Sequence, residues 1–309
     1  MSVTYLLGPQ RFLTTAGTVV RGLGEDGPVA TITAGWEERE SDDAELDTVM
    51  AGRTRNLHLY ARMIEVIERD SAVGKALLTL RDAVDDLAGA YGVRLHHALD
   101  AVYAVRRRTG RRDVVDAAYR DALDAVRRLD AWYLKEVRAL YGEAADTGAV
   151  EGSGLFHEHR GEVAQTLEGC QVLAVAGGHV GMLLRSMQFF GFRPPADLPV
   201  VAWSAGAMAM TRTVVLFNDT AAAGNWAEVW DRGAGRVDRV VALPHARRRL
   251  HLDDRIRMQV LAGRFADSAC LLLDDGAKVL VGPDGELPPG ARVVRADGTV
   301  GPVTSGEGS

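Results

Sequence analysis

The stretch from Pro199 to Met208 constrains the fold of this chain more than any other part of the sequence. It reads PVVAWSAGAM, so an apolar run leads into Ser204 and small residues follow it. A short apolar run predicts a buried strand, and small residues allow a helix to begin within one tight turn. A strand that turns directly into a helix is typical of parallel α/β sheets. The stretch therefore predicts an α/β core with Ser204 at the carboxyl end of a strand.

The segments on either side follow the same plan. The N-terminal part predicts a strand over 3–7, a helix over 12–23 and a second strand over 29–33, which is β-α-β order. Parallel-sheet rules then favour a doubly wound, mostly parallel, flavodoxin-like sheet. Further strands are expected at 172–176, 198–203, 237–243 and 269–273, with helices over 180–190 and from 205. Residues 278–281 and 292–295 are predicted to pair as a C-terminal β-hairpin.

The region from about 46 to 148 has a different period and is expected to be wholly helical. Apolar residues recur at steps of three and four over 80–95 and again over 123–140, and Thr109-Gly110 separates the two stripes. That spacing predicts two amphipathic helices in an antiparallel hairpin. We interpret residues 46–148 as a helical insertion into a discontinuous core of residues 1–45 and 149–303, followed by a disordered tail at 304–309.

Composition narrows the classes of function. The 309 residues carry a formal net charge of −6, so no overall basic field favours nucleic acid, and the arginine runs at 106–108 and 247–249 are read as solvated faces. No run approaches the roughly 20 apolar residues that span a bilayer. The cysteines, Cys170 and Cys270, have no metal-ligand spacing. We expect a cytoplasmic protein without a signal peptide, a cofactor, or a nucleic-acid or membrane partner.

Ser204 has the surroundings that a nucleophile elbow requires, because its strained backbone tolerates only small neighbours. The helix that follows would aim the amide of Ala205 at developing negative charge. The turn Gly177-Gly178, after the strand at 172–176, could supply a second oxyanion donor. Two plainer interpretations stay open: a serine that only caps a helix, and a glycine turn that binds phosphate or is simply tight.

A nucleophilic serine needs a base, and the base needs an orienting acid. His245 follows the strand at 237–243, at the edge where open α/β sheets carry their sites. Asp219, after the elbow helix, is the expected acid, with Glu228 and Asp231 as alternatives. The pair His157 and His159 has no carboxylate at helical spacing, so no metal site is expected there.

Taken together, these segments resemble the class I glutamine amidotransferase-like superfamily, in its serine-peptidase branch with aspartyl dipeptidase and cyanophycinase. The likeness rests on Trp203-Ser204-Ala205-Gly206-Ala207, on Ala176-Gly177-Gly178 and on Pro244-His245, and it covers roughly residues 1–45 and 150–300. The chain departs from the branch where Ala202 replaces the first elbow glycine and His179 replaces an Asn or Asp. The insertion at 46–148 has no counterpart in the compact dipeptidases.

The resemblance implies a serine hydrolase that cleaves an amide or peptide bond, and a bond next to an acidic residue is one such substrate. Ser204 would attack the carbonyl and His245 would carry the proton. The substrate, a small peptide or amide, would contact residues at the same edge: His179, Trp36, Arg255 and Arg257. Two alternatives stay open. In one, a non-catalytic module works in assembly through its helical insertion, with a homodimer possible. In the other, the same pocket senses an acidic ligand without turnover.

Overall fold

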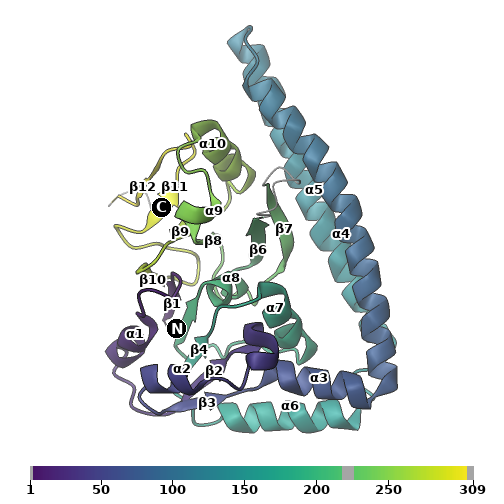
Figure 1. The fold of residues 1–309 in the computed structure, drawn as a ribbon. Helices are drawn as coiled ribbons and strands as arrows, with labels where there is room; N and C mark the ends of the chain where they lie inside the picture. Colours follow the sequence, from purple (N-terminus) through teal and green to yellow (C-terminus); the bar gives the residue numbers. More distant parts are fainter. Residues whose placement is uncertain (1–2, 218–225, 305–309) are drawn as a thin grey trace.

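The computed structural model describes residues 3–217 and 226–304 of the chain, which adopt a mixed α/β arrangement (Figure 1). The main sheet has six strands in the order β10-β1-β5-β4-β2-β3, and only β10 runs antiparallel to its neighbour. Its strands are β1 (Thr4–Leu7), β2 (Val29–Ile32), β3 (Thr54–Asn56), β4 (Val172–Val175), β5 (Val200–Trp203) and β10 (Lys278–Val281).

Helices cover both faces of the main sheet because its central strands are apolar on both sides. In β4, Val172 and Ala174 pack into one cluster with α1 and α2, whereas Leu173 and Val175 pack into another with α3, α7 and α8. Strands buried on both faces read as continuous apolar runs, as β4 and β5 do. These helices are α1 (Ala16–Gly22), α2 (Ala44–Val49), α3 (Leu59–Arg69), α7 (Val180–Phe189) and α8 (Ala205–Met210).

A second, four-stranded sheet in the order β12-β11-β9-β8 lies beside the first and shares its largest core cluster. Its helix α10 packs on β9 and β11. The remaining elements of this part are β8 (Val240–Pro244), α9 (Ala246–Arg249), α10 (Arg255–Arg264), β9 (Ala269–Leu273), β11 (Arg292–Val294) and β12 (Val300–Pro302).

The predicted C-terminal hairpin between residues 278–281 and 292–295 is wrong, because each of these strands has another partner. β10 does not pair with the strand at 292–294; it completes the edge of the main sheet beside β1, where Val279 and Val281 are buried. The true C-terminal hairpin joins β11 to β12. Its turn contains Gly298, whose φ of 81° suits a tight reversal, whereas ten residues with three prolines, 282–291, separate β10 from β11.

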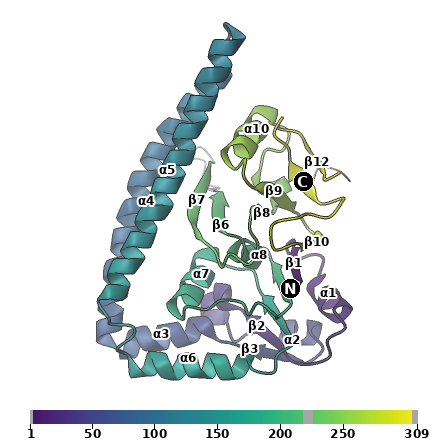
Figure 2. The same cartoon turned by 180° about the vertical axis from the view of Figure 1, so that it is seen from behind.

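Two long antiparallel helices, α4 (Ser71–Arg106) and α5 (Arg112–Asp146), form a hairpin that extends past the core (Figures 1 and 2). The short hairpin of β6 (Thr213–Phe217) and β7 (Ala227–Arg232) packs on α5, and α6 (Gly154–Leu167) packs on α3. Among the described residues, no helix has the length and apolar character to cross a bilayer.

A buried ionic network joins the helical hairpin to the core. The guanidinium of Arg264 on α10 donates to both carboxylate oxygens of Asp130 on α5, at 2.7 and 2.6 Å. Tyr91 on α4 donates its hydroxyl hydrogen to Asp130 and accepts from the Val229 amide of β7 at 3.2 Å. Arg264 is 5 % exposed and Asp130 is 8 % exposed. Burying two charges is costly, and the hydrogen bonds that both side chains form offset this cost.

The prediction that residues 46–148 are wholly helical is wrong at one point. Thr54–Asn56 is a strand, β3, that pairs in parallel with β2 and extends the main sheet. Three polar residues at a sheet edge carry no alternating pattern, so no periodic signal in the sequence predicts this strand. The first helix is also shorter than expected, and Phe12 lies outside it with 81 % of its surface exposed.

Candidate active site

Ser204 lies between β5 and α8 in a backbone conformation that side chains rarely adopt. Its φ is 52° and its ψ is −119°, and its amide donates to the carbonyl of Leu7 on β1 at 3.2 Å. Such strain persists only where the surroundings enforce it, and it is concentrated at functional sites. The residue is half-buried, and its hydroxyl makes no hydrogen bond with the described residues. A nucleophile elbow requires a strained residue of this kind between a strand and a helix.

Close packing around Ser204 leaves room only for small residues. A Cβ on Gly206 would collide with the backbone carbonyl of Val175, so only glycine lets α8 approach β4. A Cβ on Gly177 would lie 2.9 Å from the Ser204 Cβ and 3.4 Å from its Oγ. The structure therefore brings together Ser204 and the glycine turn that the sequence singled out.

The glycine turn itself is held against the segment after β2. The amide of His179 donates to the carbonyl of Gly35 at 2.7 Å, and Gly178 has a φ of 131° that favours glycine. In the described parts of the chain, the amides of Gly178 and Ala205 donate no hydrogen bond. Free amide hydrogens beside a serine hydroxyl are what an oxyanion hole requires.

His245 follows β8 directly and has a left-handed backbone, with φ 55° and ψ 36°. Its amide donates to the carbonyl of Leu273 on β9 at 3.1 Å. Burial, together with the positive charge of Arg249, lowers the pKa of its imidazole, and the carboxylate of Asp275 opposes that shift. A lowered pKa keeps the ring neutral at pH 7, the form in which it can accept a proton.

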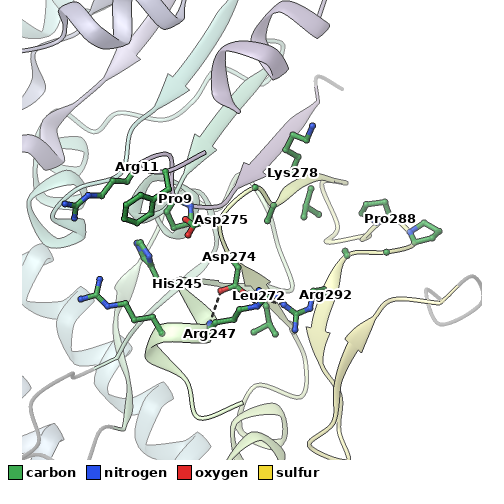
Figure 3. A pocket seen from close by; sticks show the side chains of 18 residues that line it. Pro9, Arg11, His245, Arg247, Leu272, Asp274, Asp275, Lys278, Pro288 and Arg292 are labelled. Carbon is green, nitrogen blue, oxygen red and sulfur yellow. Dashed lines mark hydrogen bonds and ion pairs between the residues drawn. The ribbon is translucent and has the colours of Figure 1, made fainter. Parts of the chain in front are cut away.

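The side chain of His245 lies on the wall of a cavity of about 690 Å³ (Figure 3). Two neighbouring acids, Asp274 and Asp275, line it. Asp274 accepts from the Arg247 amide at 2.9 Å and from Arg292 at 3.2 Å, so its oxygens are used. Asp275 is exposed and forms no hydrogen bond or ion pair with the described residues. The basic side chains in the lining are Arg11, Arg247, Arg248, Lys278 and Arg292.

Sequence reasoning missed Asp275, although a signal was present. Asp274-Asp275 follows β9 directly, and β9 runs parallel to β8 with Leu273 opposite Pro244. Residues just after adjacent parallel strands lie at the same edge of a sheet. The position that indicated His245 after β8 therefore also indicates Asp274 and Asp275 after β9.

Ser204 and His245 follow strands of different sheets, and their side chains are not hydrogen-bonded to each other. Ser204 does not line the His245 cavity. The end of β1 lies between them. Leu7 accepts the amide of Ser204, and a Cβ on the next residue, Gly8, would collide with the backbone of Asp274. Catalytic hydrogen bonds are often long without ligand, so this geometry is compatible with a catalytic pair but does not display one.

The three acids expected for the triad have different positions. Asp219 lies outside the described residues. Glu228 is half-buried on β7. Asp231, on the same strand, is buried and accepts from Gln188 Nε2 at 3.0 Å, and burial raises the pKa of its carboxyl. Of the described acids, the carboxylates of Asp275 and Asp274 act to raise the pKa of the His245 imidazole, against the lowering by burial.

The four residues expected to contact substrate are not gathered in one place. His179 is exposed beside the glycine turn, where its Nδ1 accepts the Met182 amide at 3.1 Å and caps α7. Trp36 packs on the cluster around Trp203. Arg255 pairs with Asp297 at 2.9 Å, and Arg257 lies over the Trp226 ring. Neither α10 arginine lines the His245 cavity, because α10 turns them toward other partners.

No group of metal ligands occurs among the described residues. His159 instead bonds to Glu65 at 3.0 Å and Glu162 at 3.2 Å within an ionic cluster on α3 and α6. The two cysteines are free thiols, and burial raises the pKa of Cys270 to about 12.

Comparison with known proteins identifies no relative of this chain. Neither the family models nor the curated proteins that were compared with the chain match it.

Proposed function

We propose that this protein is a serine hydrolase of the class I glutamine amidotransferase-like superfamily, with the doubly wound, flavodoxin-like core and serine-peptidase chemistry that its motifs resemble. The observation that carries the proposal is the backbone of Ser204, with φ 52° and ψ −119° between a buried strand and a helix. A serine that only caps a helix does not need this strain, because N-cap residues normally have β-region angles.

In the proposed reaction, the neutral imidazole of His245 takes the hydroxyl proton of Ser204 as the oxygen attacks an amide carbonyl. The amides of Gly178 and Ala205 receive the oxyanion, and one such donor is worth roughly 3–4 kcal/mol in known proteases. The negative charge of Asp275 favours the protonated imidazole. Asp219, the acid expected from the sequence, lies outside the described residues. His245 then returns the proton to the leaving amine. In the second half of the reaction, His245 takes a proton from water, which attacks the acyl-enzyme and releases the acid product and free Ser204.

The charge of the His245 cavity supports a substrate with a carboxylate. Five basic side chains and two acids line it, and Asp274 pairs with Arg247 and Arg292. Lys278 and Arg248 form no ion pair with the described residues, so the cavity keeps an excess of positive charge. A peptide or amide with an acidic residue would complement it.

Hydrolysis of Asp-X dipeptides and of β-Asp-Arg by the wild type and by Ser204→Ala tests the proposal. We expect release of free amino acids by the wild type only. Equal rates for the two proteins would remove Ser204 from the chemistry. Failure of both to cleave any substrate, together with no covalent labelling of Ser204, would favour a non-catalytic module that works through its helical hairpin.

A further inference from the structure

A second cavity, of about 520 Å³, is lined by residues at the base of the helical hairpin and by residues of α7. Its walls come from α3, α4, α5, α6 and α7, and the base of the hairpin is visible beside α3 and α6 in Figure 2. The volume falls within the range of pockets that hold small ligands. Apolar side chains dominate the lining, among them Ile64, Ile67, Leu77, Val84, Phe156 and Phe189.

The face of α4 beside this cavity is apolar and only partly covered by protein. Leu77, Leu80 and Val84 continue the stripe whose later part, from Tyr91 onward, is buried against α5. Between residues 75 and 90, however, no α4 side chain is buried. An apolar stripe that stays in contact with water loses the stabilisation that burial would give, about 25 cal/mol per Å². The stripe therefore indicates an apolar occupant.

A charged group on the cavity wall has no protein partner. Arg185 on α7 is half-buried, and in the described parts of the chain its guanidinium forms neither an ion pair nor a hydrogen bond. One turn later, the buried Oε1 of Gln188 also lacks a donor, while its Nε2 is fixed on Asp231 at 3.0 Å. Polar groups in native interiors are normally satisfied, so this wall is incomplete without a ligand or ordered water.

The other charged residues of the lining are already paired. Arg81 bonds to Asp82 at 2.9 Å on the exposed side of α4, and Arg160 lies 3.8 Å from Glu151. Arg185 therefore leaves the cavity with one uncompensated positive charge within an apolar wall. A compact anion attached to an apolar chain matches both features.

We propose that this cavity binds an amphiphilic carboxylate, with its chain along Leu77, Leu80 and Val84 and its carboxylate on the guanidinium of Arg185. The site lies on the hairpin side of α7 and uses none of the residues assigned to hydrolysis. The binding proposal can therefore be tested independently of the proposed serine chemistry.

Isothermal titration with dodecanoate, below its micelle concentration, tests the assignment. We expect one site per chain, with weaker binding of dodecyltrimethylammonium, whose positive charge would face Arg185. Arg185→Met keeps the apolar stem and removes the charge, and we expect it to weaken dodecanoate binding by about tenfold, as the loss of a charged hydrogen bond implies. Arg81→Met is the matched control on the same wall; because Arg81 is already paired, its effect should stay under about threefold.

A second variant keeps the charge and removes the space. Ala76 is half-exposed on the cavity wall, so Ala76→Trp fills the cavity without disturbing a packed core, and we expect it to abolish dodecanoate binding. Circular dichroism and thermal unfolding establish that each variant is folded. No binding by the wild type, equal binding of the cationic amphiphile, or indifference to both variants would overturn the proposal. So would a dimer in light scattering that Ala76→Trp converts to monomer, since a second copy would then cover this face.

Discussion

Ser204 and His245 share one property at the residue scale: each follows a strand directly and has a positive φ, 52° and 55°. Left-handed or strained backbone at a non-glycine residue costs of order 1–3 kcal/mol. Neighbouring glycines make the conformation of Ser204 possible, and the sequence could predict that arrangement because small residues are visible in it. The left-handed backbone of His245 has no comparable signal and could not be predicted.

The strain at Ser204 predicts an order of stability between two variants that both lack the hydroxyl. Ser204→Gly relieves the strain, whereas Ser204→Ala keeps it, so we expect the glycine variant to be more stable by about 1 kcal/mol after the entropy cost of glycine. Urea unfolding measures the difference. An alanine variant as stable as the glycine variant would mean that the backbone at Ser204 is not strained.

The environment of His245 predicts a pH profile. Burial and Arg249 lower the pKa of the imidazole below 6.5, so the ring loses its proton as the pH rises through a value below 6.5. The rate of fluorophosphonate labelling should therefore reach half its plateau below pH 6.5. Asp275→Asn should move this midpoint to still lower pH, because the carboxylate stabilises the protonated ring, and Arg249→Gln should move it higher.

The matched control for this profile is Asp267→Asn, which removes an acid that does not line the His245 cavity. It should leave the midpoint unchanged. A profile that neither Asp275→Asn nor Arg249→Gln shifts would exclude His245 as the titrating base.

At the scale of elements, the contact between α8 and β4 holds the elbow in place. Gly206→Ala would push a methyl group into the Val175 carbonyl, and we expect a loss of roughly 2–3 kcal/mol, as for other overpacked sites. Gly161→Ala is the control: its Cβ meets no atom within 4 Å, and alanine gains about 1 kcal/mol over glycine inside a helix. Thermal unfolding should separate the pair, and a tolerated Gly206→Ala would contradict the described packing.

The network around Asp130 fastens the helical hairpin to the second sheet. Asp130→Ala leaves the guanidinium of Arg264 buried without its partner, and we expect a loss of about 3–5 kcal/mol. Asp113→Ala breaks an exposed pair with Arg111 and should leave the free energy of unfolding almost unchanged. Denaturant unfolding of both variants checks the contrast. Equal losses would show that the buried pair does not anchor the hairpin.

Periodic elements were predictable from the sequence and aperiodic ones were not. The two long helices and the apolar strands β4, β5 and β9 have strong patterns over their whole length. The polar edge strand β3 has no pattern, and β10 paired elsewhere than expected, because pairing partners depend on which sheet edge is open rather than on local sequence.

At the scale of the whole molecule, the candidate site depends on two sheets that meet at the end of β1. The main sheet presents Ser204, the second presents His245 and Asp275, and Gly8 lies between them against Asp274. The sequence indicated Ser204 and His245 by their places after strands, but it did not indicate Asp275 or show that the strands belong to different sheets. For that reason it could not set the separation of Ser204 and His245, nor show that Arg255 and Arg257 turn away from the cavity.

The most direct test of the nucleophile is to treat the folded protein with a fluorophosphonate and identify the modified peptide by mass spectrometry. The account predicts one covalent adduct, on Ser204, that is absent in Ser204→Ala and forms much more slowly in His245→Ala. An unmodified Ser204 in the folded wild-type protein, or an adduct confined to another residue, would contradict it.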